Sequence, residues 1–193
     1  MIHRFAECIV TYWENRGILK SKNREVYVYG VDLAVYTILS TLGLLLIGWI
    51  GGYPIESTIL IALYYALQST GGGFHASTHL RCFISMAVGM ILFLFSLRFY
   101  HFLPLYLGLA LIASILLWRY PLILHPNKRH LAQRAQKCVI RSRCITLSCI
   151  VLLLISILFK FSNSITQTFA FALICGAVSR AAARIQHKSL VFR

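Results

Sequence analysis

The sequence predicts an all-α integral membrane protein with about six transmembrane helices, an N-terminal amphipathic helix and a basic cytoplasmic loop helix. The 193-residue chain is 59% hydrophobic and 12% charged, with a mean hydropathy of +0.74. A soluble domain is about 45–50% apolar and about a quarter charged, so this chain has too few polar residues to cover a water-facing surface. Several apolar runs approach the roughly 20 residues that a helix needs to cross a bilayer. We therefore expect a single membrane-embedded domain over residues 1–193.

The first 30 residues are expected at the cytoplasmic membrane surface. Apolar residues recur at helical spacing and fall on one face, at Ile2, Phe5, Ile9 and Trp13. This pattern is typical of an amphipathic helix that lies on the inner leaflet. An ordinary short helix packed on the bundle is the alternative.

Six apolar segments follow, and each is a candidate membrane span. They cover residues 31–51, 54–68, 82–99, 102–118, 144–159 and 165–179. The second, fifth and sixth are shorter than ideal, which a locally thinned bilayer or a polar cavity tolerates. Residues 54–81 could also be partly re-entrant rather than a simple crossing.

The basic residues predict the orientation of these spans. With the N-terminus placed inside, 17 Lys and Arg residues fall on the cytoplasmic side and only Arg98 and Lys160 fall outside. This asymmetry favours six crossings with both termini, including the tail 184–193, in the cytoplasm. It also places the turn at residues 69–82 at the cytoplasmic face.

The loop 119–143 is the main polar region between spans. Pro121 and Pro126 interrupt the chain, and residues 128–143 have the pattern of a basic helix. Such a loop can fix topology and bind anionic lipid, or it can dock an acidic partner. The net charge of +14 fits either role. Nucleic-acid binding is not expected, because no recognition motif accompanies the charge.

The turn between the second and third spans carries the residues best suited to chemistry. It contains Gly71, Gly72 and Gly73, then His75, and Cys82 opens the next span. A thiolate is the nucleophile of a cysteine protease, and a nearby histidine or a helix N-terminus lowers the thiol pKa. The chain has six cysteines, none spaced as a metal site, so we expect neither a metal nor another cofactor.

Two histidines compete for the role of base. In one straight helix, His75 would lie about 10 Å from Cys82, too far for a hydrogen bond. The helix must therefore begin after His75, or the glycine turn must fold His75 back. His79 is three residues before Cys82 and within helical reach. These arguments leave His75 and His79 as alternative bases. The non-catalytic alternative is that Cys82 only packs between helices, which is the usual role of a membrane cysteine near a histidine.

The segment Gly72-Gly73-Phe74-His75-Ala76, followed by Cys82 seven residues after the histidine, resembles the signature of the accessory gene regulator B family. The chain length, the six apolar segments and Pro126-Asn127-Lys128 also resemble that family. Its members are bacterial membrane cysteine endopeptidases that process quorum-sensing peptide precursors. The resemblance implies that His75 is the base and Cys82 the nucleophile, and that the protein forms a homodimer in the cell membrane.

The resemblance further implies an acyl-enzyme thioester, which the peptide's own cysteine or serine attacks to give a cyclic thiolactone or lactone. The implied precursor has an amphipathic leader and an acidic C-terminal tail. We expect that tail to dock on the basic loop, at Lys128, Arg129, Arg134 and Lys137.

A third, orienting residue is not evident from the sequence. Gln68 stands where family members often carry a basic residue, and Asp32 is the one acid within a span at the cytoplasmic level. Both are candidates for orienting or positioning. The main alternative function is a small multispan transporter or channel subunit with the glycines as a hinge. A membrane scaffold with a basic cytoplasmic face is a third.

Overall fold

The computed structural model describes residues 2–18, 24–72, 78–99, 103–122 and 132–191. Within these residues the regular structure is seven α-helices and no strand, which confirms the all-α prediction. The chain divides into two compact units, residues 1–46 and residues 47–193.

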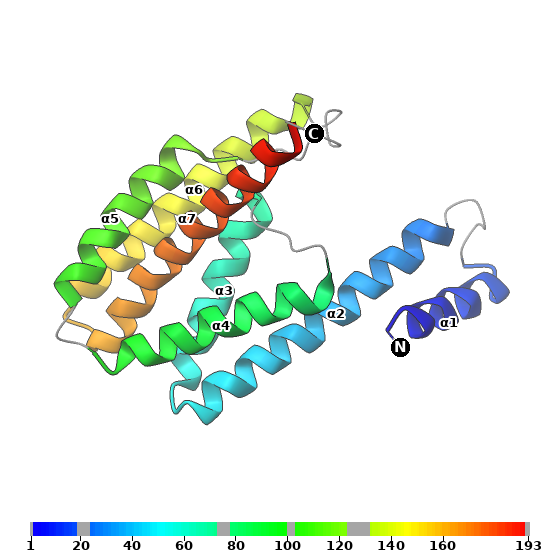
Figure 1. The fold of residues 1–193 in the computed structure, drawn as a ribbon, viewed down its shortest axis with the longest axis horizontal. Coiled ribbons are helices and arrows are strands. Elements are labelled where there is room, and N and C mark those ends of the chain that lie inside the picture. Colours follow the sequence, from blue (N-terminus) through cyan, green and yellow to red (C-terminus); the bar gives the residue numbers. More distant parts are fainter. Residues whose placement is uncertain (1, 19–23, 73–77, 100–102, 123–131, 192–193) are drawn as a thin grey trace. The chain divides into compact units, whose positions relative to one another are not determined.

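The first unit contains α1 (Ile2–Asn15) and the larger part of α2 (Arg24–Ile50) (Figure 1). Ala6 and Val10 of α1 are fully buried against Val28 of α2, and the Arg24 guanidinium pairs with the Glu14 carboxylate at 3.2 Å. Of the predicted apolar face, Trp13 packs on this cluster and Phe5 is 56% exposed.

The second unit is a bundle built around α7 (Asn163–Val191). The helices α3 (Pro54–Gly71), α4 (His79–Leu97), α5 (Leu103–Arg119) and α6 (Ala132–Leu158) all pack against it. In Figure 1, α5 and α6 run alongside α7, whereas α3 and α4 run at an angle to it. The bundle core is formed by Leu67, Ala110, Ala113, Leu117, Cys149, Leu153, Phe169, Ala170, Leu173 and Ala177.

Small residues on α7 let α3 approach closely. A Cβ atom at Gly176 would lie 3.0 Å from Cδ1 of Leu67, which is tighter than ordinary van der Waals contact. Small residues at helix interfaces are typical of packing within a membrane, where close backbone approach increases dispersion contacts. The last turns of α3 are thereby held against the C-terminal half of α7.

At its other end, α7 anchors α4. The Gln167 amide is fully buried and donates a hydrogen bond of 2.8 Å to the carbonyl of Ser96. The Phe93 and Phe171 rings also pack with centroids 5.2 Å apart. These contacts hold the C-terminal end of α4, while the residues 78–81 at its start are exposed.

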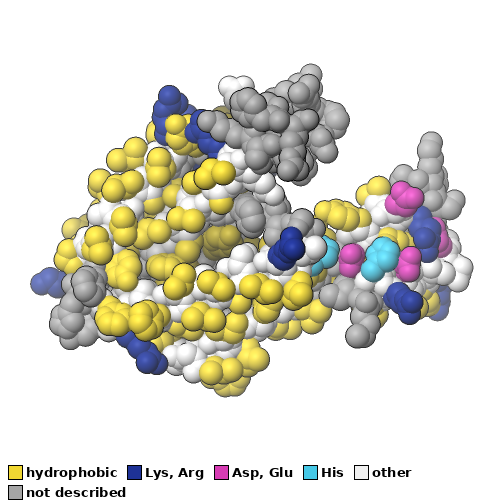
Figure 2. Space-filling model, in the orientation of Figure 1, with side chains coloured by type: hydrophobic (Ala, Val, Ile, Leu, Met, Phe, Trp, Pro, Cys, Tyr) yellow, Lys and Arg dark blue, Asp and Glu magenta, His cyan; other side chains and the backbone are white. Residues whose placement is uncertain are grey.

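Four helices in the described part of the chain are long and apolar enough to cross a membrane. They are α2, α4, residues 136–158 of α6 and residues 163–186 of α7; α5 is apolar but shorter. Figure 2 shows hydrophobic side chains over much of the visible helical surface, as expected for helices that face lipid.

Two helices extend beyond the predicted spans. The predicted basic helix over 128–143 is helical in its described residues, 132–143. These residues are not a separate loop helix, because they form the first turns of α6 and continue directly into its apolar part. Likewise α7 passes through Ser179 and ends at Val191, so Arg180 lies inside a helix and not in a tail.

Candidate active site

The candidate turn begins where α3 ends. Gly71 is buried in the last turn of α3, and Gly72 caps the helix with its N–H donating to the carbonyl of Gln68 at 3.1 Å. Gly72 has a φ of +69°, a left-handed conformation that glycine adopts without steric cost. The predicted site residues Gly73 and His75 lie outside the described residues.

The structure begins α4 at His79, three residues before the predicted span. Thr78 has extended backbone and its side-chain oxygen accepts a hydrogen bond of 3.3 Å from the N–H of Arg81, which is the geometry of a helix N-cap. The sequence argument required the helix to begin after His75 or the turn to fold back. The observed start of α4 meets the first of these conditions.

Cys82 lies at the end of the first turn of α4. Its N–H donates to the carbonyl of Thr78 at 3.1 Å, and its side chain is half-buried with a free thiol. The first turn of a helix carries partial positive charge, which favours the thiolate over the thiol. The nucleophile predicted from sequence therefore lies at a partly accessible helix start.

His79 occupies the first position of α4, one helical turn before Cys82. Its side chain is exposed. The structure thus keeps His79 within reach of Cys82, as helical spacing predicted.

Gln68 is held in a polar network between α3 and α7. Its Nε2 donates to the hydroxyls of Tyr64 and Ser179, the latter at 2.7 Å. Its Oε1 is buried and has no partner among the described residues. An unpaired buried acceptor costs about 1–3 kcal/mol, so this oxygen is suited to receive an N–H from a group outside the described residues.

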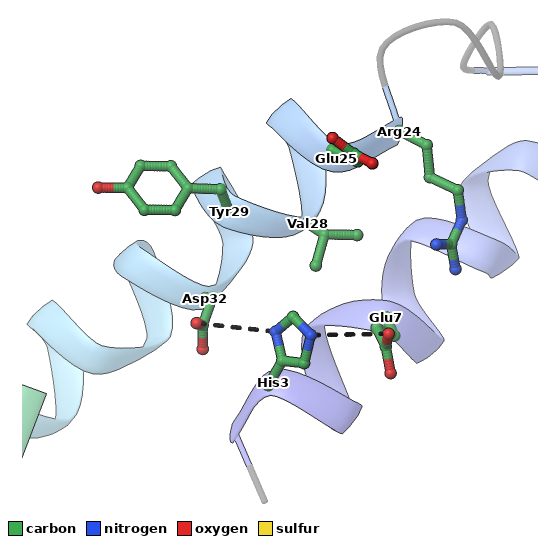
Figure 3. Close-up of a pocket in the computed structure, with 7 residues that line it drawn as sticks. All are labelled: His3, Glu7, Arg24, Glu25, Val28, Tyr29 and Asp32. Carbon is green, nitrogen blue, oxygen red and sulfur yellow. Dashed lines mark ion pairs between the residues drawn. The ribbon is translucent and has the colours of Figure 1, made fainter. Parts of the chain in front are cut away.

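Asp32 belongs to the first unit, where it faces α1. Its Oδ2 lies 3.9 Å from Nδ1 of His3, and Nε2 of His3 lies 3.6 Å from the Glu7 carboxylate (Figure 3). These side chains line a small pocket between α1 and α2, together with Arg24, Glu25, Val28 and Tyr29. Within its unit, Asp32 is therefore engaged by a histidine that the sequence analysis did not consider.

The predicted docking residues fall at or before the start of α6. Lys128 and Arg129 lie outside the described residues, and Arg134 lies in the first turn of α6. Lys137 is exposed on the same helix.

Arg180 is the residue that sequence reasoning missed. It was counted as a cytoplasmic tail charge, but it is only 4% exposed and contacts α3, α5 and α6. The available signal was an arginine that directly follows an apolar segment with no interrupting glycine or proline.

Comparison with known proteins agrees with this layout. The family model described as accessory gene regulator B matches residues 6–180. No curated protein and no solved structure matches the chain. The match extends over most of the chain, including the glycine turn, Cys82 and all seven helices in whole or in part. The chain therefore belongs to the accessory gene regulator B family, which takes part in processing quorum-sensing peptides.

Proposed function

We propose that this protein is a membrane-embedded cysteine endopeptidase that cleaves a small quorum-sensing peptide precursor on its C-terminal side. The observation that carries the proposal is the placement of Cys82 in the first turn of α4, a helix that begins after His75 and follows the glycine-capped end of α3. A helix start favours a thiolate, and the half-buried side chain remains open to substrate. Family membership supports the substrate class.

The proposed reaction proceeds through a thioester. His75 takes the proton of the Cys82 thiol, and the thiolate attacks the scissile carbonyl to give a tetrahedral intermediate. Collapse breaks the peptide C–N bond, His75 returns the proton to the leaving amine, and the C-terminal fragment departs. The peptide's own cysteine or serine then attacks the thioester, which releases a cyclic thiolactone or lactone and regenerates Cys82. The activated acyl bond is conserved, so this step needs no ATP.

Gln68 is the best-supported orienting residue for this mechanism. Tyr64 and Ser179 bind the Nε2 of its amide, and its buried Oε1 has no partner among the described residues. Gln68 precedes His75 by seven positions in the sequence. A side-chain amide that accepts the histidine N–H holds the imidazole in the tautomer that can receive the thiol proton.

The test is mass spectrometry of a candidate precursor co-expressed with the wild type and with Cys82→Ala, His75→Ala and His79→Ala. The precursor is taken from a short reading frame beside this gene. We expect cleavage to be lost in the first two variants and kept in His79→Ala. Cleavage that persists in Cys82→Ala would refute the peptidase and favour transport. Loss in His79→Ala with retention in His75→Ala would reassign the base.

The proposed recognition of the precursor is electrostatic. An acidic tail is expected to bind the basic start of α6 and the residues before it, where Lys128, Arg129, Arg134 and Lys137 are concentrated. Replacing these four residues with Gln should weaken precursor capture, and raising the salt concentration should weaken capture by the wild type. Unchanged precursor capture by the variant with all four substitutions, at physiological salt, would exclude this docking site.

A further inference from the structure

Arg180 is a buried cation with no acidic partner among the described residues of its own unit. Its side chain is 4% exposed, and the only acidic residue of the second unit is Glu56. Glu56 accepts a hydrogen bond from Ser164, near the opposite end of α7. Ser164 and Arg180 are separated by about 24 Å along the helix axis. A charge inside an apolar bundle is costly, so the Arg180 guanidinium must be compensated by other groups.

Neutral oxygens from three helices provide that compensation. Nη2 donates to the carbonyl of Leu67 in α3 at 3.2 Å and to the hydroxyl of Ser142 in α6 at 3.0 Å. Nη1 donates to the carbonyls of Leu117, in α5, and Tyr120, just after it, at 3.4 and 3.3 Å. The planar fork of an arginine can satisfy four acceptors at once, which a lysine ammonium cannot match.

The carbonyls that Arg180 binds lie in the last two turns of α3 and α5 or, for Tyr120, directly after α5. A helix C-terminus carries partial negative charge, so two such ends stabilise the cation. The Leu117 carbonyl also needs a donor, because the residue four positions later is Pro121, which has no N–H. Arg180 supplies the hydrogen bond that the proline removes.

Gly71 provides the space for this arrangement. A Cβ atom at this position would overlap the Arg180 guanidinium, which is held in place by its four acceptors. The neighbouring Ser179 accepts from Gln68, so consecutive residues of α7 hold consecutive residues of α3. The last turn of α3 is thereby fixed immediately before the turn that leads to His75.

We propose that Arg180 is a positioning residue of the active site, which fixes the last turn of α3 and so holds Gln68 in place. The proposal rests on the proposed function. Misplacing a reacting group by about 1 Å can cost 100-fold in rate. Loss of the Arg180 contacts with α3 should therefore lower kcat more than it changes KM, because Arg180 is not one of the proposed docking residues.

A double-mutant cycle tests the contact itself without reference to catalysis. Thermal unfolding in detergent is compared for the wild type, Gly71→Ala, Arg180→Ala and the double variant. Gly71→Ala should lower the Tm in the wild-type background, because the new methyl group displaces the guanidinium. It should have little further effect in Arg180→Ala, because the space is then open. If Gly71→Ala lowers the Tm equally in the wild-type and Arg180→Ala backgrounds, Gly71 does not make room for Arg180 and the proposal is overturned.

Kinetics test the positioning role. With purified protein in vesicles and the precursor peptide, Arg180→Met should lower kcat about 10- to 100-fold with KM changed by less than about threefold. Methionine is apolar and fills much of the space of the arginine side chain. Arg180→Met can therefore be assayed even if Arg180→Ala does not fold. Arg180→Lys should recover part of the loss. The matched control is Arg184→Gln, one turn further along α7. Arg184 is exposed, and its Cζ lies 4.2 Å from the centroid of the Tyr120 ring.

The outcomes separate this proposal from the proposed function. A wild type that cleaves the precursor and an Arg180→Met variant with unchanged kcat would overturn the positioning role and leave the peptidase intact. A rise in KM alone would assign Arg180 to substrate binding and also overturn it. A wild type that does not cleave overturns both, even if the unfolding cycle shows coupling between Gly71 and Arg180.

Discussion

At the scale of single residues, the Gln68 amide is the feature on which the site geometry depends most. Its Nε2 has two hydroxyl partners, one on its own helix at Tyr64 and one on α7 at Ser179. The amide orientation, and so the direction of its unpaired oxygen, is set by these hydroxyls. A neutral hydrogen bond of this kind contributes about 0.5–1.5 kcal/mol.

Removing one of these hydroxyls should therefore impair catalysis moderately. We expect Tyr64→Phe and Ser179→Ala each to lower kcat up to about tenfold, which corresponds to about 1.4 kcal/mol, with little change in KM. Steady-state cleavage of the precursor measures this effect. Tyr106→Phe is the control, since it removes a tyrosine hydroxyl from α5. A larger effect in the control than in Tyr64→Phe would contradict the role of Gln68.

At the scale of elements, the start of α4 depends on one N-cap. Thr78 satisfies the Arg81 N–H one residue before Cys82, and loss of a threonine cap costs about 1 kcal/mol. Thr78→Ala should fray the first turn and slow alkylation of Cys82 by iodoacetamide at neutral pH, because the helix no longer favours the thiolate. Thr78→Ser should preserve the cap. Site-resolved mass spectrometry of the alkylated peptide measures the rate of Cys82 alkylation. Equal rates in Thr78→Ala and Thr78→Ser would show that the Thr78 cap does not affect the Cys82 thiol.

The end of α3 depends on the backbone of Gly72. An alanine at its φ of +69° costs about 1–2 kcal/mol, so Gly72→Ala should lower the Tm and displace the chain that leads to His75. Gly108 in α5 offers the comparison, because nothing lies within 4 Å of a Cβ added there. Gly108→Ala should leave the Tm unchanged or raise it, since alanine is the better helix former. A Tm loss of equal size at both positions would contradict the conformational argument.

Helix boundaries were the least predictable elements, for a physical reason. Hydropathy locates the part of a helix that lies in lipid, whereas the helix itself ends where capping groups and backbone conformation end it. The basic first turns of α6 and the extension of α7 to Val191 are helical without being apolar, so no apolar window contains them. The start of α4 was missed by three residues because Thr78 was not recognised as a cap.

At the scale of the whole molecule, composition and the length of the apolar segments were sufficient to predict an all-α chain with apolar helices long enough to cross a membrane. The choice of Cys82 rests on the motif and its family resemblance, and it stays a prediction. The side-chain contacts around Gln68 and Arg180 could not be predicted from composition or residue spacing. Gln68 and Ser179 are 111 residues apart, and Arg180 reaches Leu67 across 113 residues. Such pairs follow from the packing of α3 on α7, which linear patterns do not encode. The count of basic residues assigned Arg180 to the cytoplasmic surface, because that count treats every arginine after a span as a loop charge.

The distribution of charge makes a prediction for the topology of the whole chain. Seventeen of the 19 basic residues fall on one side if the spans alternate, so the start of α6 should face the cytoplasm and the turn before α7 the outside. In a cysteine-free background, Ser162→Cys in intact cells should react with a membrane-impermeant maleimide, and Lys137→Cys should react only after permeabilisation. Both positions are exposed on the protein, so burial does not prevent labelling. Labelling of both sites from outside would show that α6 does not cross, because these two residues flank its apolar part. The reversed pattern would place the basic start of α6 outside, where it could not receive a precursor made in the cytoplasm.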